Sequence, residues 1–243
     1  MTQSRGKALI TGADGPLGRA MALCLAARGH DVALHCAGNR AGAETTAGEA
    51  RKLGVQARVL LADLLDEDQT AGLIMQAAQA LDGPLTVLIN NASIHEQDTL
   101  HSATPDSWHR HFGSNLRAPF VLTQGFAAQA PRATRDPAGE WRAPGLVINI
   151  IDPRMRKPSP QFMTYTLAMT GLWSLTRTSA LALAPDIRVN AIGPGPSPDA
   201  AKPEDVTATL GYFLDAPVVT GQVICTDAGP SPDWQPPRTP GAA

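Results

Sequence analysis

Seven short runs of aliphatic and β-branched residues recur along this chain, and stretches with helical periodicity lie between them. The runs are KALIT (7–11), DVALHC (31–36), ARVLLA (57–62), LTVLIN (85–90), GLVINII (145–151), IRVNAI (187–192) and QVICT (222–226). The helical stretches cover about residues 17–28, 43–53, 67–81, 105–129, 162–184 and 203–214. Such alternation is typical of βαβ units around a parallel sheet. It predicts an α/β fold: a single-domain, Rossmann-type, doubly wound parallel sheet of about seven strands with helices on both faces.

Two stretches interrupt this alternation. Residues 131–145, PRATRDPAGEWRAPG, are polar and predict a surface loop, whereas residues 230–243, PSPDWQPPRTPGAA, predict a Pro-rich flexible tail. Since no composition break divides the rest, we expect residues 1–229 to form one dinucleotide-binding domain.

The charge balance excludes some classes of partner. A net charge of -2 without a basic stripe gives no reason to expect nucleic acid or a membrane as partner. No window approaches the length of a spanning helix and the start lacks a signal-peptide pattern, so we expect a cytoplasmic protein. The three cysteines have no metal-site spacing, and the histidines of the segment 95–111 mix loop and helix positions. We therefore predict no metal site and interpret these histidines as surface residues.

A glycine-rich turn, TGADGPLG (11–18), joins the first strand to the first helix. Its backbone amides and the helix amino terminus could hold a pyrophosphate, with Gly12 and Gly18 as anchors; alternatively, the glycines only make a tight connection. Asp63 and Asn90 follow the third and fourth strands, at the edge where ligands bind in open α/β sheets. Asp63 could accept a hydrogen bond from an adenine amine, and Asn90 could tie adjacent strands together.

In this order, the motifs TGADGPLG, ADLLD, NNAS, SNLRAPF, RVNAIGPG and VTGQVICTDAG resemble those of the short-chain dehydrogenase/reductase superfamily, over about residues 7–229. The resemblance implies a nicotinamide dinucleotide, a small-molecule substrate and a homotetramer or homodimer. It also implies cofactor-binding positions at Thr11, Gly12, Leu17, Gly18, Asn39, Arg40, Asp63, Leu64, Asn91, Ala92, Pro194 and Gly195.

The same resemblance assigns the catalytic positions. Tyr165 matches the proton-transferring tyrosine, and Asn115 matches the asparagine that holds a water in the proton relay. Asp152, thirteen residues before Tyr165, falls where most members have serine. Met169 falls where the family has lysine. The aspartate looks most like the pteridine reductase branch, including dihydromonapterin reductases, and implies a pterin substrate.

The second strand ends in LHCAGNR, without the acid that would bind a ribose 2′-hydroxyl and repel a 2′-phosphate. Asn39 and Arg40 are close enough in sequence to meet a phosphate, although Arg40 could equally be a solvated loop charge. NADP(H) is therefore favoured over NAD(H).

Met169 leaves two functions open. A lysine at i+4 from Tyr165 would lower the pKa of the phenol and bind the ribose; methionine does neither. The chain is then an NADPH-dependent reductase with an atypical, weakened site, or a catalytically inactive relative that acts as a nucleotide-binding sensor or assembly module. Pro16, at a position that is glycine or arginine in the family, and the short connection before Pro203 favour the second. The retained Asn115, Asp152 and Tyr165 favour the first.

Overall fold

The computed structural model describes residues 6–153, 160–195 and 202–227. Its strands are β1 (Lys7–Ile10), β2 (Asp31–Cys36), β3 (Ala57–Leu61), β4 (Val87–Asn90), β5 (Thr134–Arg135), β6 (Trp141–Arg142), β7 (Gly145–Ile150), β8 (Ile187–Gly193) and β9 (Val223–Cys225). Its helices are α1 (Pro16–Ala27), α2 (Arg40–Lys52), α3 (Glu67–Ala80), α4 (Pro105–Phe112), the π-helix η1 (Gly113–Arg117), α5 (Ala118–Gln129), α6 (Met163–Leu183) and α7 (Pro203–Asp215).

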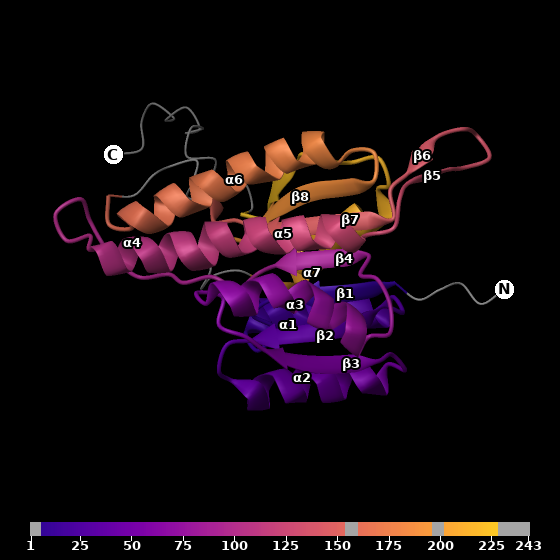
Figure 1. Ribbon diagram of the computed structural model, residues 1–243, viewed down its shortest axis with the longest axis horizontal. Helices are drawn as coiled ribbons and strands as arrows, with labels where there is room; N and C mark the ends of the chain where they lie inside the picture. Colours follow the sequence, from indigo (N-terminus) through magenta and orange to yellow (C-terminus); the bar gives the residue numbers. More distant parts are fainter. Residues whose placement is uncertain (1–5, 154–159, 196–201, 228–243) are drawn as a thin grey trace, which may run out of the picture.

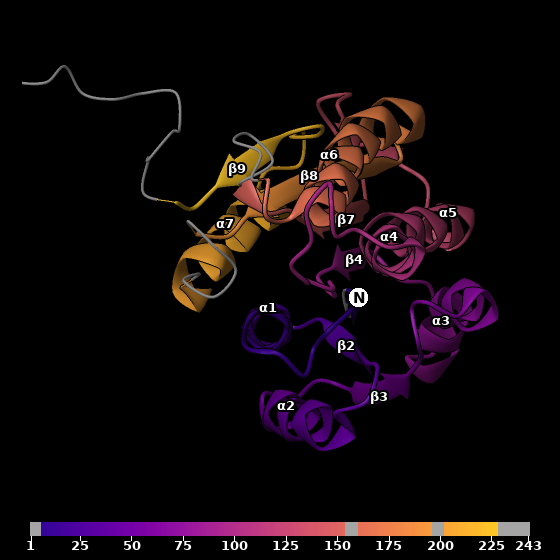
Figure 2. The same ribbon diagram turned by 90° about the vertical axis from the view of Figure 1, so that its left-hand side faces the viewer.

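Seven strands form one sheet in the order β3-β2-β1-β4-β7-β8-β9, and every pairing in it is parallel. Figures 1 and 2 show α1, α2 and α7 on one face, and α3, α4, α5 and α6 on the other. The chain moves outward from β1 to β3 and then crosses to β4, which lies on the other side of β1. This reversal beside β1 is the topological switch point at which doubly wound sheets bind ligands. The predicted fold class is confirmed.

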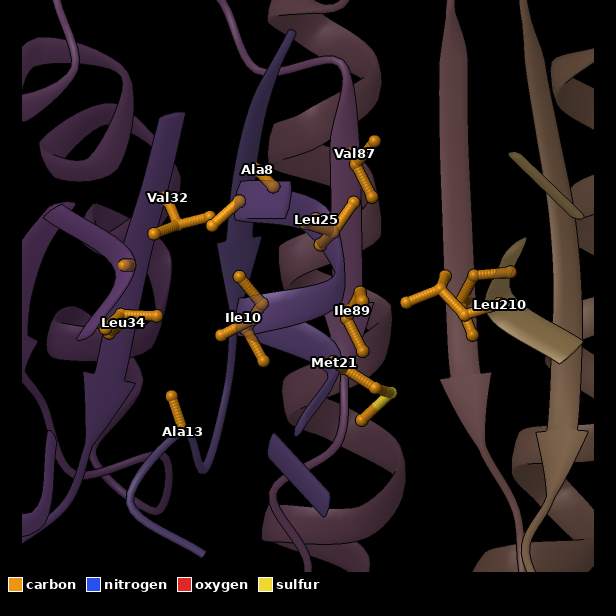
Figure 3. Close-up of a cluster of buried hydrophobic side chains, with 14 of the residues drawn as sticks. Ala8, Ile10, Ala13, Met21, Leu25, Val32, Leu34, Val87, Ile89 and Leu210 are labelled. Carbon is orange, nitrogen blue, oxygen red and sulfur yellow. The ribbon is translucent and has the colours of Figure 1, made fainter. Parts of the chain in front are cut away.

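The strands are apolar on both faces because helices cover both faces. Ile10, Leu34 and Ile89 point toward α1 and α7, where Leu25 and Leu210 pack against them (Figure 3). The intervening residues, such as Leu9 and Leu88, belong to the core under α3, α5 and α6. This burial of both strand faces holds the carboxyl ends of the strands rigidly at one edge of the sheet.

Three elements differ from the prediction, each for a local reason. Helix α2 begins three residues earlier than expected, because the Asn39 side chain caps it by accepting a hydrogen bond from the Gly42 amide at 3.1 Å. The single helix expected over 105–129 contains the π-turn η1. The segment 131–145 is not merely a loop, since β5 and β6 pair in it and the Arg142 guanidinium lies 2.5 Å from the Asp136 carboxylate.

The expected tail at 230–243 lies outside the described residues. Within the described part of the chain, none of the helices combines the length and the apolar character that a membrane crossing requires.

Candidate active site

The turn between β1 and α1 is tight because glycine occupies its most crowded positions. Gly12 has a φ of +64°, a conformation that glycine adopts without steric cost. A Cβ atom added at Gly18 would lie 2.2 Å from the Gly12 carbonyl oxygen. The turn therefore brings the backbone of residues 12–18 close together and exposes the amino end of α1, which attracts phosphate groups.

Side chains at the ends of β1 and β4 tie this turn to the centre of the sheet. The Thr11 hydroxyl accepts hydrogen bonds from the backbone amides of Asn91 and Ala92 at 2.9 and 3.0 Å. The Asn91 side-chain amide donates to the carbonyl oxygens of Thr11 and Gly12 at 2.9 and 3.0 Å. Thr11, Asn91 and Ala92 thus fix the turn at the switch point.

A cavity of about 640 Å³ opens above these strand ends, within the usual size of a cofactor site. Its wall includes twelve residues singled out in the sequence: Gly12, Pro16, Leu17, Gly18, Asp63, Leu64, Asn91, Ala92, Asp152, Tyr165, Met169 and Pro194. It also includes residues that the sequence analysis missed: Asp14, His35, Ala37, Gly38, Ser93, Ile94, Ser114 and Ile150 among others.

The structure does not bring every expected residue to the cavity wall. Asn39 is occupied as the cap of α2, and the exposed Arg40 guanidinium lies 4.0 Å from the Glu44 carboxylate. Ala37 and Gly38 border the cavity in their place. Gly195 also lies outside the wall, with its amide donating to the Thr226 hydroxyl at 3.3 Å.

His35 joins the glycine turn to the neighbouring strands. Its Nδ1 atom accepts a hydrogen bond from the Gly12 amide at 3.3 Å, so its Nε2–H donates to the Ala62 carbonyl oxygen at 3.0 Å. Burial lowers the pKa of this imidazole, whereas Asp14 and Asp63 act in the opposite direction. A polar residue inside the apolar run DVALHC was the available sequence signal for this link.

Tyr165 and Asp152 meet at the other end of the cavity. The Tyr165 hydroxyl, on α6, donates a hydrogen bond to Asp152 Oδ2 at 3.2 Å, and both residues are only 3% exposed. Asn90 donates to Asn149 at 2.8 Å, and Asn149 donates to Thr176 on α6 at 2.9 Å. This buried chain of side chains fixes α6 against β7 and confirms the expected role of Asn90 in tying strands together.

Asn115, in η1, does not border the cavity. Its side chain exchanges two 2.8 Å hydrogen bonds with the backbone of Ile94, donating to the carbonyl oxygen and accepting from the amide. It sits in the π-turn η1, a feature frequent at functional sites. These two bonds occupy the side-chain amide of Asn115.

Two histidines hold the Tyr165 ring. His95 stacks on Phe162 and meets Tyr165 edge to face with the ring centroids 4.6 Å apart, and His111 approaches the same ring at 5.8 Å. The expectation that all these histidines lie on the surface is wrong for His111, which is fully buried. Its ring nitrogens find partners in Thr164 and the Glu96 amide, which satisfies them without water.

The charged side chains in the described part of the cavity wall share one sign. Among the described residues of the wall, Asp14, Asp63 and Asp152 are acidic, and none is lysine or arginine. Arg154, Arg156 and Lys157, which could supply a cation, lie outside the described residues. The glycine turn fits a dinucleotide pyrophosphate through backbone amides and the helix terminus, without a basic side chain in the described wall.

Replacing Gly18 by alanine should abolish this fit. The added methyl group would overlap the Gly12 carbonyl oxygen and the Ala13 Cα atom, at 2.2 and 2.8 Å, so the turn must open. We expect dinucleotide affinity to fall by roughly two orders of magnitude and stability by about 1–3 kcal/mol. Calorimetric titration and urea unfolding measure the two effects. Gly48→Ala in α2, where nothing lies within 4 Å of the added Cβ, is the control.

Comparison with known proteins places this cavity in context. A family model described as short chain dehydrogenase matches residues 6–204. General stress protein 39 of Bacillus subtilis is 31% identical over 215 residues, covering 85% of this chain and 71% of that protein. The 3-oxoacyl-(acyl-carrier-protein) reductase FabG of Staphylococcus aureus is 31% identical over 196 residues, covering 80% and 74%.

A solved structure is similar over the whole fold. FolM alternative dihydrofolate reductase 1 from Brucella canis, complexed with NADP, is 36% identical with a TM-score of 0.84, and 96% of each chain is covered.

Proposed function

Because the chain belongs to the short-chain dehydrogenase family, we propose that it is an NADP(H)-dependent reductase that acts on a pterin or a similar small oxidised substrate. The observation that carries the proposal is the 3.2 Å hydrogen bond from Tyr165 to Asp152 in the wall of the cavity that begins at the glycine turn. It joins a proton donor and an orienting carboxylate at a site shaped for a dinucleotide.

In this proposal, Gly12, Leu17 and Gly18 hold the pyrophosphate, and Asp63 and Leu64 hold the adenine. When bound, the dinucleotide supplies a hydride. Tyr165 donates a proton to the substrate.

The groups around Tyr165 orient that donor. Asp152 accepts the phenol hydrogen bond, and its negative charge favours the neutral, proton-bearing phenol. Asn115 holds a water through the backbone of η1, because its side chain is bonded to Ile94.

The pterin assignment and the choice of NADP(H) rest on two further observations. Asp152 stands where most family members have serine, and the similar Brucella protein is an alternative dihydrofolate reductase complexed with NADP. The end of β2 presents Ala37 and Gly38 to the cavity rather than an acid. A 2′-phosphate next to the ribose therefore meets no carboxylate from this strand end.

Met169 supports a competing proposal, that of a nucleotide-binding module without catalysis. The residue lies one helical turn after Tyr165 and borders the cavity, so its own side chain supplies no charge where a lysine would act. A module of this kind would bind the dinucleotide but turn over no substrate.

Titration with NADPH and NADH, followed by calorimetry, tests the proposed function. We expect micromolar binding of NADPH and weaker binding of NADH, and then reduction of dihydropterin or dihydrofolate under NADPH. NADPH binding with no turnover of either substrate would favour the non-catalytic module. If neither nucleotide bound at millimolar concentration, both proposals would fail.

We also propose a homodimer or homotetramer with residues 1–229 as its folded unit. Apolar side chains exposed on α4, α5 and α6 support this assembly, with Trp108 45%, Phe120 50% and Leu167 45% exposed. Such residues gather at contacts between subunits. Sedimentation of the purified protein gives the oligomeric state.

A further inference from the structure

Helix α6 begins beside the cavity without a capping side chain of its own. Its first two residues, Met163 and Thr164, directly precede Tyr165, so the start of this helix determines where the phenol points. Phe162 occupies the capping position, and its side chain has no oxygen that could accept a hydrogen bond. The first amides of a helix have no partner inside the helix, and the first turn frays unless an acceptor is supplied.

Asp98, in the loop after β4, supplies this acceptor from another part of the chain. Its backbone carbonyl oxygen accepts from the Met163 amide at 3.2 Å, and its Oδ1 atom accepts from the Thr164 amide at 3.0 Å. Asp98 also forms an isolated parallel bridge with Phe162. The carboxylate is only 4% exposed and lies at the amino end of α6, where the helix dipole favours a negative charge. Asp98 therefore caps the helix that carries Tyr165.

The other oxygen of this carboxylate also meets donors. Oδ2 accepts from the Thr164 hydroxyl and, at 3.0 Å, from the Ser107 hydroxyl. The Thr164 hydroxyl accepts from His111 Nδ1–H at 2.7 Å, because His111 Nε2 accepts from the Glu96 amide. The Thr164 proton is therefore left for Asp98. Burial raises the pKa of the Asp98 carboxyl, but hydrogen bonds from Thr164 and Ser107 lower that pKa by more, so it lies below its ordinary value. This position thus suits an ionised carboxylate, which only accepts hydrogen bonds.

The loop that carries Asp98 also forms part of the cavity wall. Ser93 and Ile94, nearer the start of this loop, border the cavity. The segment between β4 and Asp98 contains no helix or strand, so side-chain contacts must hold it in place. Asn115 holds it at Ile94, and Asp98 holds it at the start of α6. The cap therefore fixes two parts of the wall relative to each other: the loop after β4 and the helical turn that carries Tyr165.

We propose that Asp98 is a positioning residue for the proton donor: together with Thr164, its carboxylate holds Tyr165 and the loop after β4 in the geometry that proton transfer requires. Asp98 does not border the cavity, so it acts through Tyr165 and not on the substrate. This inference rests on the proposed function, since it takes Tyr165 as the proton donor. A displacement of about 1 Å can lower the rate of such a step by about 10²-fold.

Asp98→Asn tests this proposal because it keeps the size of the side chain and one oxygen for the Thr164 amide. Its N–H group would face the Thr164 hydroxyl, which now donates to the carboxylate. We expect kcat for NADPH-dependent reduction of dihydropterin or dihydrofolate to fall by about 10- to 100-fold, with the dissociation constant of NADPH unchanged. Amide hydrogen exchange in peptides that cover residues 163–166 should become faster. A residue that only stabilised the fold would lower the melting temperature and leave kcat of the folded enzyme unchanged.

Variants of Thr164 provide a second test that does not alter the carboxylate. Thr164→Val keeps the shape but removes the hydroxyl, so kcat should fall as in Asp98→Asn, and the double variant should lose little more than either single variant. Thr164→Ser keeps the hydroxyl and should retain most of the rate. Thr178→Val is the matched control: this exposed threonine of α6 donates to the Ser174 carbonyl oxygen at 3.0 Å, and its replacement should leave kcat unchanged.

The outcomes distinguish this inference from the proposed function. If Asp98→Asn folded and bound NADPH but kept the wild-type kcat, the inference would be overturned and the proposed function would stand. Equal losses of rate in Thr164→Ser and Thr164→Val would also overturn the inference, since the hydroxyl would not matter. If Asp98→Asn did not fold, the Thr164 variants would decide alone. If the wild-type protein bound NADPH but reduced neither substrate, the proposed function and the positioning role would fail together.

Discussion

Replacing Met169 by lysine should raise the rate of NADPH-dependent reduction by roughly 10²- to 10⁴-fold, which is the usual contribution of general acid–base catalysis to a rate. Met169 follows Tyr165 by four residues on α6, and both side chains border the cavity. An ammonium group at 169 would therefore lie beside the phenol. Its positive charge favours the ionised phenol and so makes Tyr165 a stronger acid.

The same lysine would also affect cofactor binding. It would donate hydrogen bonds toward the ribose, which methionine cannot do. Calorimetric titration with NADPH measures this contribution, and single-turnover kinetics at saturating NADPH measure the chemical step separately.

Variants of similar size provide the controls for this prediction. Met169→Gln fills the same space with a polar, uncharged side chain and should give little of the gain. Combining Met169→Lys with Tyr165→Phe should remove the gain, because no phenol is left to activate. If Met169→Lys folded normally but left the reductase rate unchanged, the missing charge would not be what limits this site.

The direction of the reaction depends on the same group. Oxidation of an alcohol needs an ionised phenol as base, and an unperturbed phenol with a pKa of about 10 is ionised about one part in a thousand at pH 7. Reduction needs only the neutral phenol, which the Asp152 carboxylate favours. We therefore expect the native protein to act in the direction of reduction.

The sequence predicts the sheet and the closeness of Asp152 and Tyr165 well, because both depend on order along the chain. Each buried strand is a short apolar run, and the spacing of Asp152 and Tyr165 follows from the strand β7 and the helix α6 that carry them. Their hydrogen bond needs little beyond that topology. Gly12 and Gly18 are recognisable for a similar reason, since backbone contacts within one turn require glycine.

The sequence does not reveal polar groups whose role depends on contacts between distant elements. Whether His111 is exposed depends on Thr164 and on the Glu96 amide, which are far from it in the chain. The role of His35 likewise depends on its two hydrogen-bond partners, the Gly12 amide and the Ala62 carbonyl oxygen. Arg40 illustrates the converse, because its closeness in sequence to β2 does not place it in the cavity wall.

Below pH 6.5 the free energy of unfolding should fall steeply, by up to about 2.7 kcal/mol per pH unit from His35 and His111 together. Burial lowers the pKa of both imidazoles in the folded protein. As the pH falls through the ordinary histidine pKa of about 6.5, these two imidazoles bind protons in the unfolded chain but stay neutral in the folded protein. Stability is therefore complete above that pH and is lost progressively below it.

The hydrogen bonds of His111 explain why its imidazole stays neutral in the folded protein. Its Nε2 atom accepts from the Glu96 amide at 3.1 Å, so its Nδ1–H donates to the Thr164 hydroxyl at 2.7 Å, and this hydroxyl donates to Asp98. Protonation would place a second N–H against the Glu96 amide. Asp98 and Glu96 raise the pKa of His111, whereas His95 and Arg110 lower it further, and burial remains the largest effect.

Urea unfolding between pH 7.5 and 5.5 measures this loss, and substitutions assign it. His111→Gln, if it folds, should reduce the slope of the free energy of unfolding against pH by about 1.4 kcal/mol per pH unit, which corresponds to one proton fewer taken up on unfolding. His101→Gln, at an exposed position, should leave the dependence unchanged. An identical pH dependence in the wild-type protein and in His111→Gln would show that His111 is not among the groups responsible.

His35 extends the same prediction to binding. A proton on its Nδ1 atom would oppose the Gly12 amide, which now donates to that atom at 3.3 Å. Acid should thus loosen the glycine turn as well as the fold, and NADPH affinity should fall in the pH range in which stability is lost. His35→Asn can still accept from an amide but does not titrate, so it should weaken this pH dependence of affinity. Because His111 lies at the Tyr165 end of the cavity, away from the glycine turn, His111→Gln should leave the pH dependence of NADPH affinity unchanged. A histidine that the sequence presents only as part of an apolar strand would then couple proton uptake to the cofactor site.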